Sequence, residues 1–242
     1  MIQLRKSDER GHASHGWLDS YHSFSFADYY DPAHMNYSVL RVINEDRIAP
    51  SMGFGTHPHR NMEIITYMLK GEIRHQDSMG NGSVIRAGDV QRMTAGSGIR
   101  HSEMNASDDT EAHLLQVWLL PERDGLPPSY EDKSISVGSK LNQWCLVASG
   151  HAQEGALKIH QDVELFASIL QQTHSLQYKF KKGRCIYLHL AVGQLQLNEY
   201  ALSAGDAVMI SDEAGFELLA TIDSEFLLFD LPELKNNELN NT

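Results

Sequence analysis

The sequence contains few cysteines, few basic residues and no long apolar run, and each shortage excludes a class of protein. Its two cysteines, Cys145 and Cys185, fit no metal-binding or redox motif, so we expect idle thiols. Its 20 basic and 32 acidic residues give a formal charge of −12, which argues against direct binding to nucleic acid or to an anionic membrane. The N-terminus lacks the apolar stretch of a signal peptide, and no run of about 18 apolar residues occurs. We therefore expect a cytoplasmic protein.

What the sequence does contain is a series of short segments rich in β-branched and aromatic residues, separated by Gly, Asn and Asp. This pattern is typical of an all-β fold. The run PERDGLPP at 121–128 has the composition of a linker, and 242 residues are enough for two domains. The expected strands lie at 38–43, 63–69, 83–85, 90–93 and 113–120, with a hairpin turn at 79–82 and a second strand-rich block at 157–231.

The two strand-rich blocks are predicted to be copies of one another. The run AGDV at 87–90 recurs as AGDAV at 204–208, and the same offset carries Gly98 onto Gly215. We therefore expect an N-terminal domain at 1–122, a linker at 123–140, a C-terminal domain at 141–232 and a disordered tail at 233–242.

Two pairs of polar residues in the first block are candidate metal ligands. His57 and His59 lie in the run GTHPH, and His101 and Glu103 lie in the run GIRHSE, with one residue between the members of each pair. Residues two apart on a β-strand point to the same face, so two neighbouring strands would aim all four side chains at one point. Imidazole and carboxylate without sulfur suit iron(II), manganese, nickel or copper, and four ligands leave two positions open on an octahedral metal. The sequence therefore predicts a metal site that can also bind a substrate.

The second block lacks every one of these ligands. Aligning the turns of the two blocks pairs His101 with Leu218, Glu103 with Ala220, His57 with Lys179 and His59 with Lys181. A metal that served only the fold would be expected in both copies. Its restriction to the first block therefore favours a functional site.

Other polar residues leave alternatives open. Glu63 shares the alternation of His57 and His59, so it is a ligand, a residue that orients a ring N–H, or a carboxylate at the edge of the core. We expect the cluster at 160–164 to be polar surface. Surface or packing roles, rather than the mouth of the site, are favoured for the histidines near the N-terminus, which are His12, His15, His22 and His34.

These motifs resemble those of the cupin fold and, more specifically, those of the pirin family. The run HPHRNME at 57–63 resembles the first cupin motif, and the segment 88–105, which ends in TAGSGIRHSEMN, resembles the second. The segment 75–80 and the opening run GWLDS at 16–20 add to the likeness. The resemblance is strongest to bacterial pirins described as quercetin 2,3-dioxygenases. It extends over about residues 1–232, with the specific motifs in the first half.

The resemblance implies a bicupin, that is, two antiparallel β-barrels in one chain with a metal only in the N-terminal barrel. Pirins bind iron through three histidines and the second-motif glutamate, which are here His57, His59, His101 and Glu103. The family favours Fe²⁺, although copper, nickel, manganese and zinc share these ligands. Thr94 stands where cupins usually have proline, and His101 lies two residues later than the general spacing; both features fit the pirin variant.

Three functions follow from this reading. In the first, a flavonol such as quercetin binds the metal, O2 cleaves its heterocyclic ring, and Glu103 acts as the base that takes the 3-hydroxyl proton. In the second, the protein is a non-enzymatic, redox-responsive pirin that modulates a protein partner, such as a transcription factor or a metabolic enzyme. In the third, the metal only stabilises the barrel.

Overall fold

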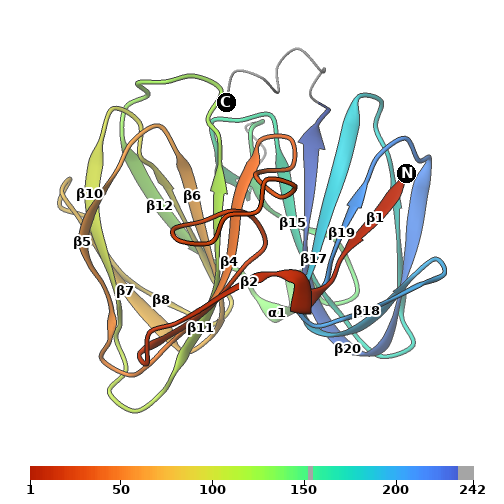
Figure 1. Ribbon diagram of the computed structural model, residues 1–242, viewed down its shortest axis with the longest axis horizontal. Coiled ribbons are helices and arrows are strands. Elements are labelled where there is room, and N and C mark those ends of the chain that lie inside the picture. The colour runs from red at the N-terminus through yellow and green to blue at the C-terminus, as the bar shows by residue number, and fades with distance from the viewer. Residues whose placement is uncertain (152–154, 234–242) are drawn as a thin grey trace.

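The structure, a computed structural model, describes residues 1–151 and 155–233 of the chain. Two lobes of β-strands lie side by side, an N-terminal lobe drawn mainly in orange to green and a C-terminal lobe in cyan to blue (Figure 1). In the described residues, helices are confined to the 3-10 helix η1 (Ser7–Glu9) and to α1 (Val137–Lys140). Neither is long or apolar enough to cross a lipid bilayer. The expected all-β class is confirmed.

Two antiparallel sheets form the N-terminal lobe. The larger has the strand order β12-β9-β6-β11-β4-β3-β2, and the smaller has the order β5-β10-β7-β8. The strands of the smaller sheet are β5 (Gly53–His59), β7 (Glu72–Asp77), β8 (Gly82–Arg86) and β10 (Ile99–Asn105). Those of the larger sheet are β2 (Gly11–Ser14), β3 (Leu18–His22), β4 (Leu40–Ile48), β6 (Glu63–Lys70), β9 (Asp89–Thr94), β11 (Ala112–Leu119) and β12 (Ser129–Ser134).

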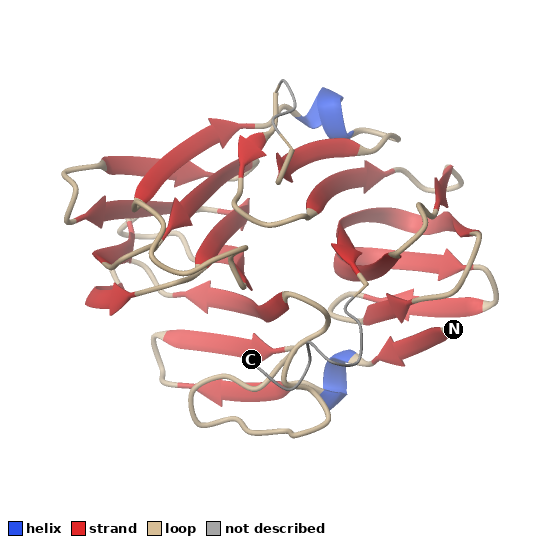
Figure 2. Cartoon of the chain, turned by 90° about the horizontal axis from the view of Figure 1, so that it is seen from above, coloured by secondary structure: helices blue, strands red, loops and turns tan. Residues whose placement is uncertain are grey.

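The C-terminal lobe is built on one sheet. Its two longest strands, β17 and β20, pair with one another. The order is β1-β19-β17-β20-β15-β13-β14, and β16 and β18 pair with β20 and β17 off this path. Figure 2 shows, from above, how little besides strands and loops the two lobes contain. The strands are β1 (Ile2–Arg5), β13 (Cys145–Ser149), β14 (Leu157–Lys158), β15 (Glu164–Leu170), β16 (Ser175–Lys179), β17 (Arg184–Leu197), β18 (Tyr200–Ser203), β19 (Ala207–Ile210) and β20 (Gly215–Pro232).

The strands expected from the sequence are present, with shifted ends. The hairpin turn expected at 79–82 joins β7 to β8. Asp77 stabilises this turn by accepting hydrogen bonds from the backbone N–H groups of Met79 and Asn81. The run at 121–128 contains no strand. Except for Glu233, the tail expected at 233–242 lies outside the described residues.

Strands cross between the lobes in both directions. The N-terminal strand β1 pairs with β19 in the C-terminal lobe, as the red strand in Figure 1 shows. Conversely, β12, which lies within the segment expected as a linker, pairs with β9 in the N-terminal lobe. The domain limits at 122 and 140 therefore remain a prediction about folding units.

One apolar core continues from the N-terminal lobe into the C-terminal lobe. It contains Ile43, Tyr67 and Val117 from the first and Leu165 and Phe229 from the second, all fully buried. Burial of apolar surface on this scale is the main favourable term in folding, so the lobes stabilise one another.

A buried ion pair also joins the lobes. The Lys140 ammonium group on α1 donates to the Tyr67 hydroxyl at 2.6 Å and to Glu225 Oε1 at 3.0 Å. Tyr67 belongs to the N-terminal lobe and Glu225 to the C-terminal lobe. Removing either partner of such a buried pair would leave an uncompensated charge, which is strongly destabilising.

Candidate metal centre

Two neighbouring strands bring the three predicted histidines together. On β5, Pro58 separates His57 from His59 and points to the opposite face, and the register places His57 directly opposite His101 on β10. The ring centroids lie 4.5 Å apart for His57 and His101, 4.8 Å for His57 and His59, and 4.9 Å for His59 and His101. One ring nitrogen of each histidine can be chosen so that all three lie within 4.8 Å of one another.

The electrostatics of the cluster favour neutral rings. Burial, together with the charges of the neighbouring histidines, lowers the pKa of His59 to about 4 and that of His101 to about 3. Both ring nitrogens of the buried His101 lack a hydrogen-bond partner. His57 directs Nδ1 at the carbonyl oxygen of Gly55 at 2.8 Å, which leaves Nε2 for another partner.

This donor set fits a divalent transition metal. Three imidazoles place one ring nitrogen each within 4.8 Å of the others, and imidazole nitrogens suit iron, nickel, copper, manganese and zinc. An imidazole that is buried without a hydrogen bond is costly unless another partner satisfies it. His101, the most buried of the three, is in this position.

Glu103 lies next to His101 but is held by a different set of side chains. Its Oε1 accepts hydrogen bonds from Gln91 Nε2 at 2.6 Å and from Thr66 Oγ1 at 3.3 Å, and its Oε2 accepts one from Gln116 Nε2 at 3.0 Å. The three donors are in register across β9, β6 and β11. We call Gln91, Thr66 and Gln116 the carboxylate cradle.

The histidine nearest to Glu103 in the sheet is His75 on β7. The register places it directly opposite Glu103, and the candidate ligand atoms of His75, His101 and Glu103 also lie within 4.8 Å of one another. The His75 ring is fully buried and stacks on Tyr130 at 4.4 Å. His75, His101 and Glu103 thus form a second group of candidate ligands, which shares His101 with the group of three histidines. Its role as a fourth ligand remains a prediction.

Glu63 points away from this cluster. It is completely buried, and its carboxylate accepts hydrogen bonds from Thr94 at 3.1 Å and from the backbone N–H of His160 at 3.2 Å. The strand is interrupted before it, because Asn61 has a φ of 50° and the segment 60–62 is not extended into β6. The alternation from His59 therefore does not reach Glu63, which is a carboxylate at the contact with the C-terminal lobe.

The segment at 160–164 is correspondingly less exposed than expected. The side chain of His160 is 28% exposed and lies 3.5 Å from Glu63, and Glu164 is buried and pairs with Lys181 at 2.6 Å. The interpretation as polar surface was wrong for these two residues, because the second lobe packs against the first at this point.

A cavity of about 640 Å³ opens onto the histidine cluster. Its walls are mostly aromatic and apolar, and the cluster side is formed by His57, His59, His101 and Glu103. The other lining side chains come from both sheets and from the N-terminal segment and include Trp17, Leu18, Phe26, Tyr29, Phe54, Ile64 and Trp118. A volume of this size suits a drug-sized organic ligand.

Three of the N-terminal histidines line the cavity, against the surface or packing role favoured from the sequence. They are His12, His15 and His22, whereas His34 bonds to Asp31 at 2.7 Å and does not line the cavity. The segment reaches the cavity because Tyr29 packs over Gly11, where a Cβ atom would lie 2.3 Å from the tyrosine ring. Such a long-range contact has no local sequence signal.

Sequence reasoning missed the carboxylate cradle, although a signal for it exists. Thr66, Gln91 and Gln116 are single uncharged polar residues inside otherwise strand-forming segments. A lone polar side chain at an inward position of a strand indicates a buried hydrogen bond.

In the C-terminal lobe, the observed register corrects the counterparts of the first two histidines. Leu218 lies opposite Leu176 and Phe216 opposite Tyr178, as His101 lies opposite His57 and Ile99 opposite His59. The structural counterparts of His57 and His59 are therefore Leu176 and Tyr178, and not the exposed Lys179 and Lys181. The alignment erred because the connection from β16 to β17 is longer than the connection from β5 to β6.

An all-β chain of two cupin lobes, with a cluster of candidate metal ligands in the first and an apolar filling in the second, is a bicupin. Family models match in the same two places: the model described as Pirin matches residues 3–119, and the model described as the Quercetinase C-terminal cupin domain matches residues 146–231. The chain belongs to the pirin family.

Similar proteins extend over nearly the whole chain. Quercetin 2,3-dioxygenase of Escherichia coli (strain K12) is 47% identical over 96% of this chain and 99% of its own length. A pirin-like protein of Caulobacter vibrioides is 42% identical over 95% of this chain and 99% of its own length. The bacterial pirin YhhW from Escherichia coli, solved in complex with nickel(II), matches with a TM-score of 0.92 and 46% identity over 97% of this chain and all of that one. The prediction of an enzyme similar to quercetin 2,3-dioxygenases is confirmed.

Proposed function

We propose that the N-terminal domain, at 1–122, is an iron-dependent dioxygenase site that cleaves the heterocyclic ring of flavonols such as quercetin with O2. The observation that carries this proposal is the cluster of three histidines at one wall of a cavity of about 640 Å³ with mostly aromatic and apolar walls. The name of the similar protein from Escherichia coli, quercetin 2,3-dioxygenase, supports the same reaction and substrate class. Nickel in the solved relative fits the ligand set too, as do copper, manganese and zinc.

His57, His59 and His101 would hold the metal, with Glu103 as a fourth ligand. The metal would act as a Lewis acid for the flavonol oxygens and as a conduit for electrons between flavonol and O2. Both atoms of O2 are incorporated, and one ring carbon leaves as carbon monoxide, so the products are a ring-opened ester and CO. The residues of the chain supply binding, orientation and proton transfer.

In this proposal, Glu103 would take the proton from the 3-hydroxyl group. It lies at the cavity wall beside His101, and the cradle directs three donors at its two oxygens. These donors fix the carboxylate in one orientation, which is what a general base requires. A carboxylate that is a loosely held metal ligand can perform this role; a tightly held one cannot.

The aromatic side chains would bind the flat rings of the substrate and exclude water. Trp118 contacts both His59, at a centroid distance of 5.0 Å, and Phe26, at 5.3 Å. Phe26 belongs to the N-terminal segment that covers the cavity. A planar ligand between these rings would lie next to the metal ligands with one edge directed at them.

The test compares quercetin consumption in air and without oxygen. We expect consumption and carbon monoxide formation in air, and neither under anaerobic conditions. The His57→Ala/His101→Ala protein, loaded under the same conditions, is expected to show at least about a 100-fold lower rate, because two of the three imidazoles are absent. Full activity in this variant would overturn the proposal.

A further inference from the structure

One carboxyl group in the cavity has no role in the proposed reaction so far. Asp46 on β4 is 3% exposed and lines the same cavity as the histidine cluster. Its Oδ1 accepts a hydrogen bond from Ser20 Oγ at 2.5 Å. Among residues 1–151 and 155–233, no donor or cation lies within bonding distance of its second oxygen, Oδ2.

The neighbouring polar side chains of the cavity also bond to one another. Asn44 lies two residues before Asp46 on the same strand, and its Oδ1 bonds to His22 Nδ1 at 2.8 Å. Ser20 and Asp46 are opposite one another in the register of β3 and β4, as are His22 and Asn44. These four residues form one polar patch in a cavity with mainly apolar walls, and within it Asp46 has an unused oxygen.

A mostly buried carboxyl group that lines a cavity and has an oxygen free for a further hydrogen bond is suited to a binding role. Burial raises the pKa of Asp46 to about 7, against the effect of the Ser20 hydrogen bond, and the negative charges of Glu103 and Glu45 raise it further. Near neutral pH the group is therefore present in both protonation states. It can accept a hydrogen bond from a hydroxyl group or donate one to it.

We propose that Asp46, oriented by Ser20, binds a hydroxyl group on a part of the substrate that does not contact the metal. The inference rests on the proposed function, since it assumes that the ligand of this cavity is a flavonol. The aromatic walls recognise the rings, the histidine cluster takes the metal-binding edge, and Asp46 selects rings that carry a hydroxyl group. Asp46 is then a specificity-determining residue of the site.

The experiment measures the binding of two flavonols to metal-loaded protein without oxygen, so that no turnover occurs. Quercetin carries hydroxyl groups on both of its outer rings, whereas 3-hydroxyflavone keeps only the metal-binding hydroxyl and the carbonyl. We expect Asp46→Leu to raise the Kd for quercetin about 10-fold or more and to change the Kd for 3-hydroxyflavone by less than about 2-fold. Asp46→Asn, which keeps the shape and one donor, should raise the Kd for quercetin by about 3-fold.

The outcomes distinguish this inference from the proposed function. If Asp46→Leu weakens the binding of both flavonols equally, or does not weaken the binding of quercetin, the proposed role of Asp46 is overturned. The dioxygenase proposal then stays intact. If the wild-type protein binds neither flavonol, both proposals fail. The metal content and the melting temperature of the variants show that the site and fold persist, and Asp46→Asn covers the case in which Asp46→Leu does not fold.

Discussion

In the N-terminal lobe, β5 and β10 direct three histidines at one point beside a cavity, whereas the paired strands β16 and β20 of the C-terminal lobe direct apolar side chains into a packed core. The counterparts of the histidines are Leu176, Tyr178 and Leu218, and all three belong to one apolar cluster. The counterpart of Glu103 is Ala220, and that of His75 is Leu195, which the register places opposite it. The same arrangement of strands thus holds candidate metal ligands in one lobe and an apolar core in the other.

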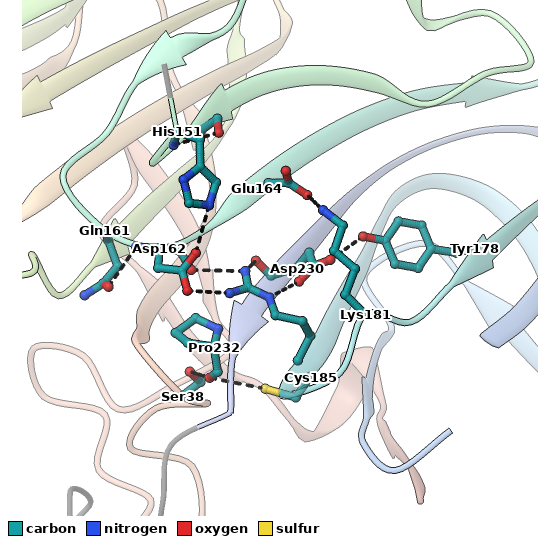
Figure 3. Close-up of polar contacts among 12 residues, drawn as sticks. Ser38, His151, Gln161, Asp162, Glu164, Tyr178, Lys181, Cys185, Asp230 and Pro232 are labelled. Carbon is teal, nitrogen blue, oxygen red and sulfur yellow. Dashed lines mark hydrogen bonds and ion pairs between the residues drawn. The ribbon is translucent and has the colours of Figure 1, made fainter. Parts of the chain in front are cut away.

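Several polar groups of the C-terminal lobe are paired with one another, although the buried ring nitrogens of His189 have no hydrogen-bond partner. Arg184 pairs with two carboxylates, with its Nε 2.5 Å from Asp230 Oδ1 and its Nη1 2.7 Å from Asp162 Oδ2. Asp162 and Asp230 are labelled in Figure 3. The hydroxyl of Tyr178, the counterpart of His59, donates to Asp230 at 2.5 Å. At equivalent strand positions, the first lobe thus carries polar side chains that face a cavity, and the second carries mainly apolar side chains that fill a core.

The largest expected effect comes from replacing a histidine of the first lobe by the residue type found at the equivalent position of the second lobe. His101→Leu removes the histidine shared by both ligand groups, and we expect loss of metal and at least about a 100-fold fall in activity. The metal-free variant should be more stable than metal-free wild-type protein by about 1–3 kcal/mol, because two unpartnered ring nitrogens leave the core. Metal analysis and urea denaturation measure the two effects. Retained metal would mean that the ligand set is wrong.

The reciprocal exchange, Leu218→His, tests the second lobe. A histidine placed in this apolar core has no partner and fills the space poorly, so we expect a loss of about 2–5 kcal/mol in the free energy of unfolding. Metal content should stay as in the wild-type protein. Urea denaturation of the metal-loaded protein provides the measurement. A variant of undiminished stability, or one with a second bound metal, would break the contrast between the lobes.

The carboxylate cradle, which the second lobe lacks, provides a smaller effect. Gln116→Leu removes the donor to Glu103 Oε2, and we expect metal affinity to fall about 10- to 100-fold if Glu103 is a ligand. The matched control is Gln76→Leu, the same substitution at an exposed position of β7, with no expected change. In a Glu103→Ala background, Gln116→Leu should have no further effect on affinity. Additive losses would indicate that Gln116 acts independently of Glu103.

The smallest expected effect concerns His189, a buried histidine of the C-terminal lobe that has no cavity to serve. Burial, with the charge of Arg10, lowers its pKa to about 4, while Glu45 and Asp206 oppose this shift and His113 adds to it. Its folded-state pKa lies below the unfolded value of about 6.5, so its contribution to stability is complete above that pH and is lost as the pH falls towards 4.

His189→Leu should therefore make stability less dependent on pH between about 6.5 and 4. One proton corresponds to a slope of at most about 1.4 kcal/mol per pH unit, and the variant should lose up to this amount of slope. Urea midpoints at several pH values measure it, with His174→Leu as an exposed control. An unchanged slope would mean that His189 is already protonated in the folded protein.

The three histidines could be predicted because they depend on one local rule. Alternation along β5 and β10 is a property of adjacent residues, and it needs only that the strands pair. The all-β fold and the bicupin arrangement were likewise available, the first from strand-forming segments and the second from the family motifs. The second lobe was predicted to lack a metal because its sequence lacks the candidate ligands.

What could not be predicted depends on contacts between distant segments or on a break in a strand. The orientation of Glu103 follows a bulge after His101 and donors from three other strands. The position of Glu63 follows the left-handed Asn61, and the covering of the cavity depends on Tyr29 over Gly11. The exchange of β1 and β12 between the lobes has no signature in the composition of either segment.

The most direct test of the difference between the lobes is the metal-to-chain ratio of protein purified without added metal. We predict one first-row transition metal per chain in the wild-type protein and in Leu218→His, and none in His101→Leu. A wild-type protein without such a metal, a ratio of two, or full occupancy in His101→Leu would contradict the account.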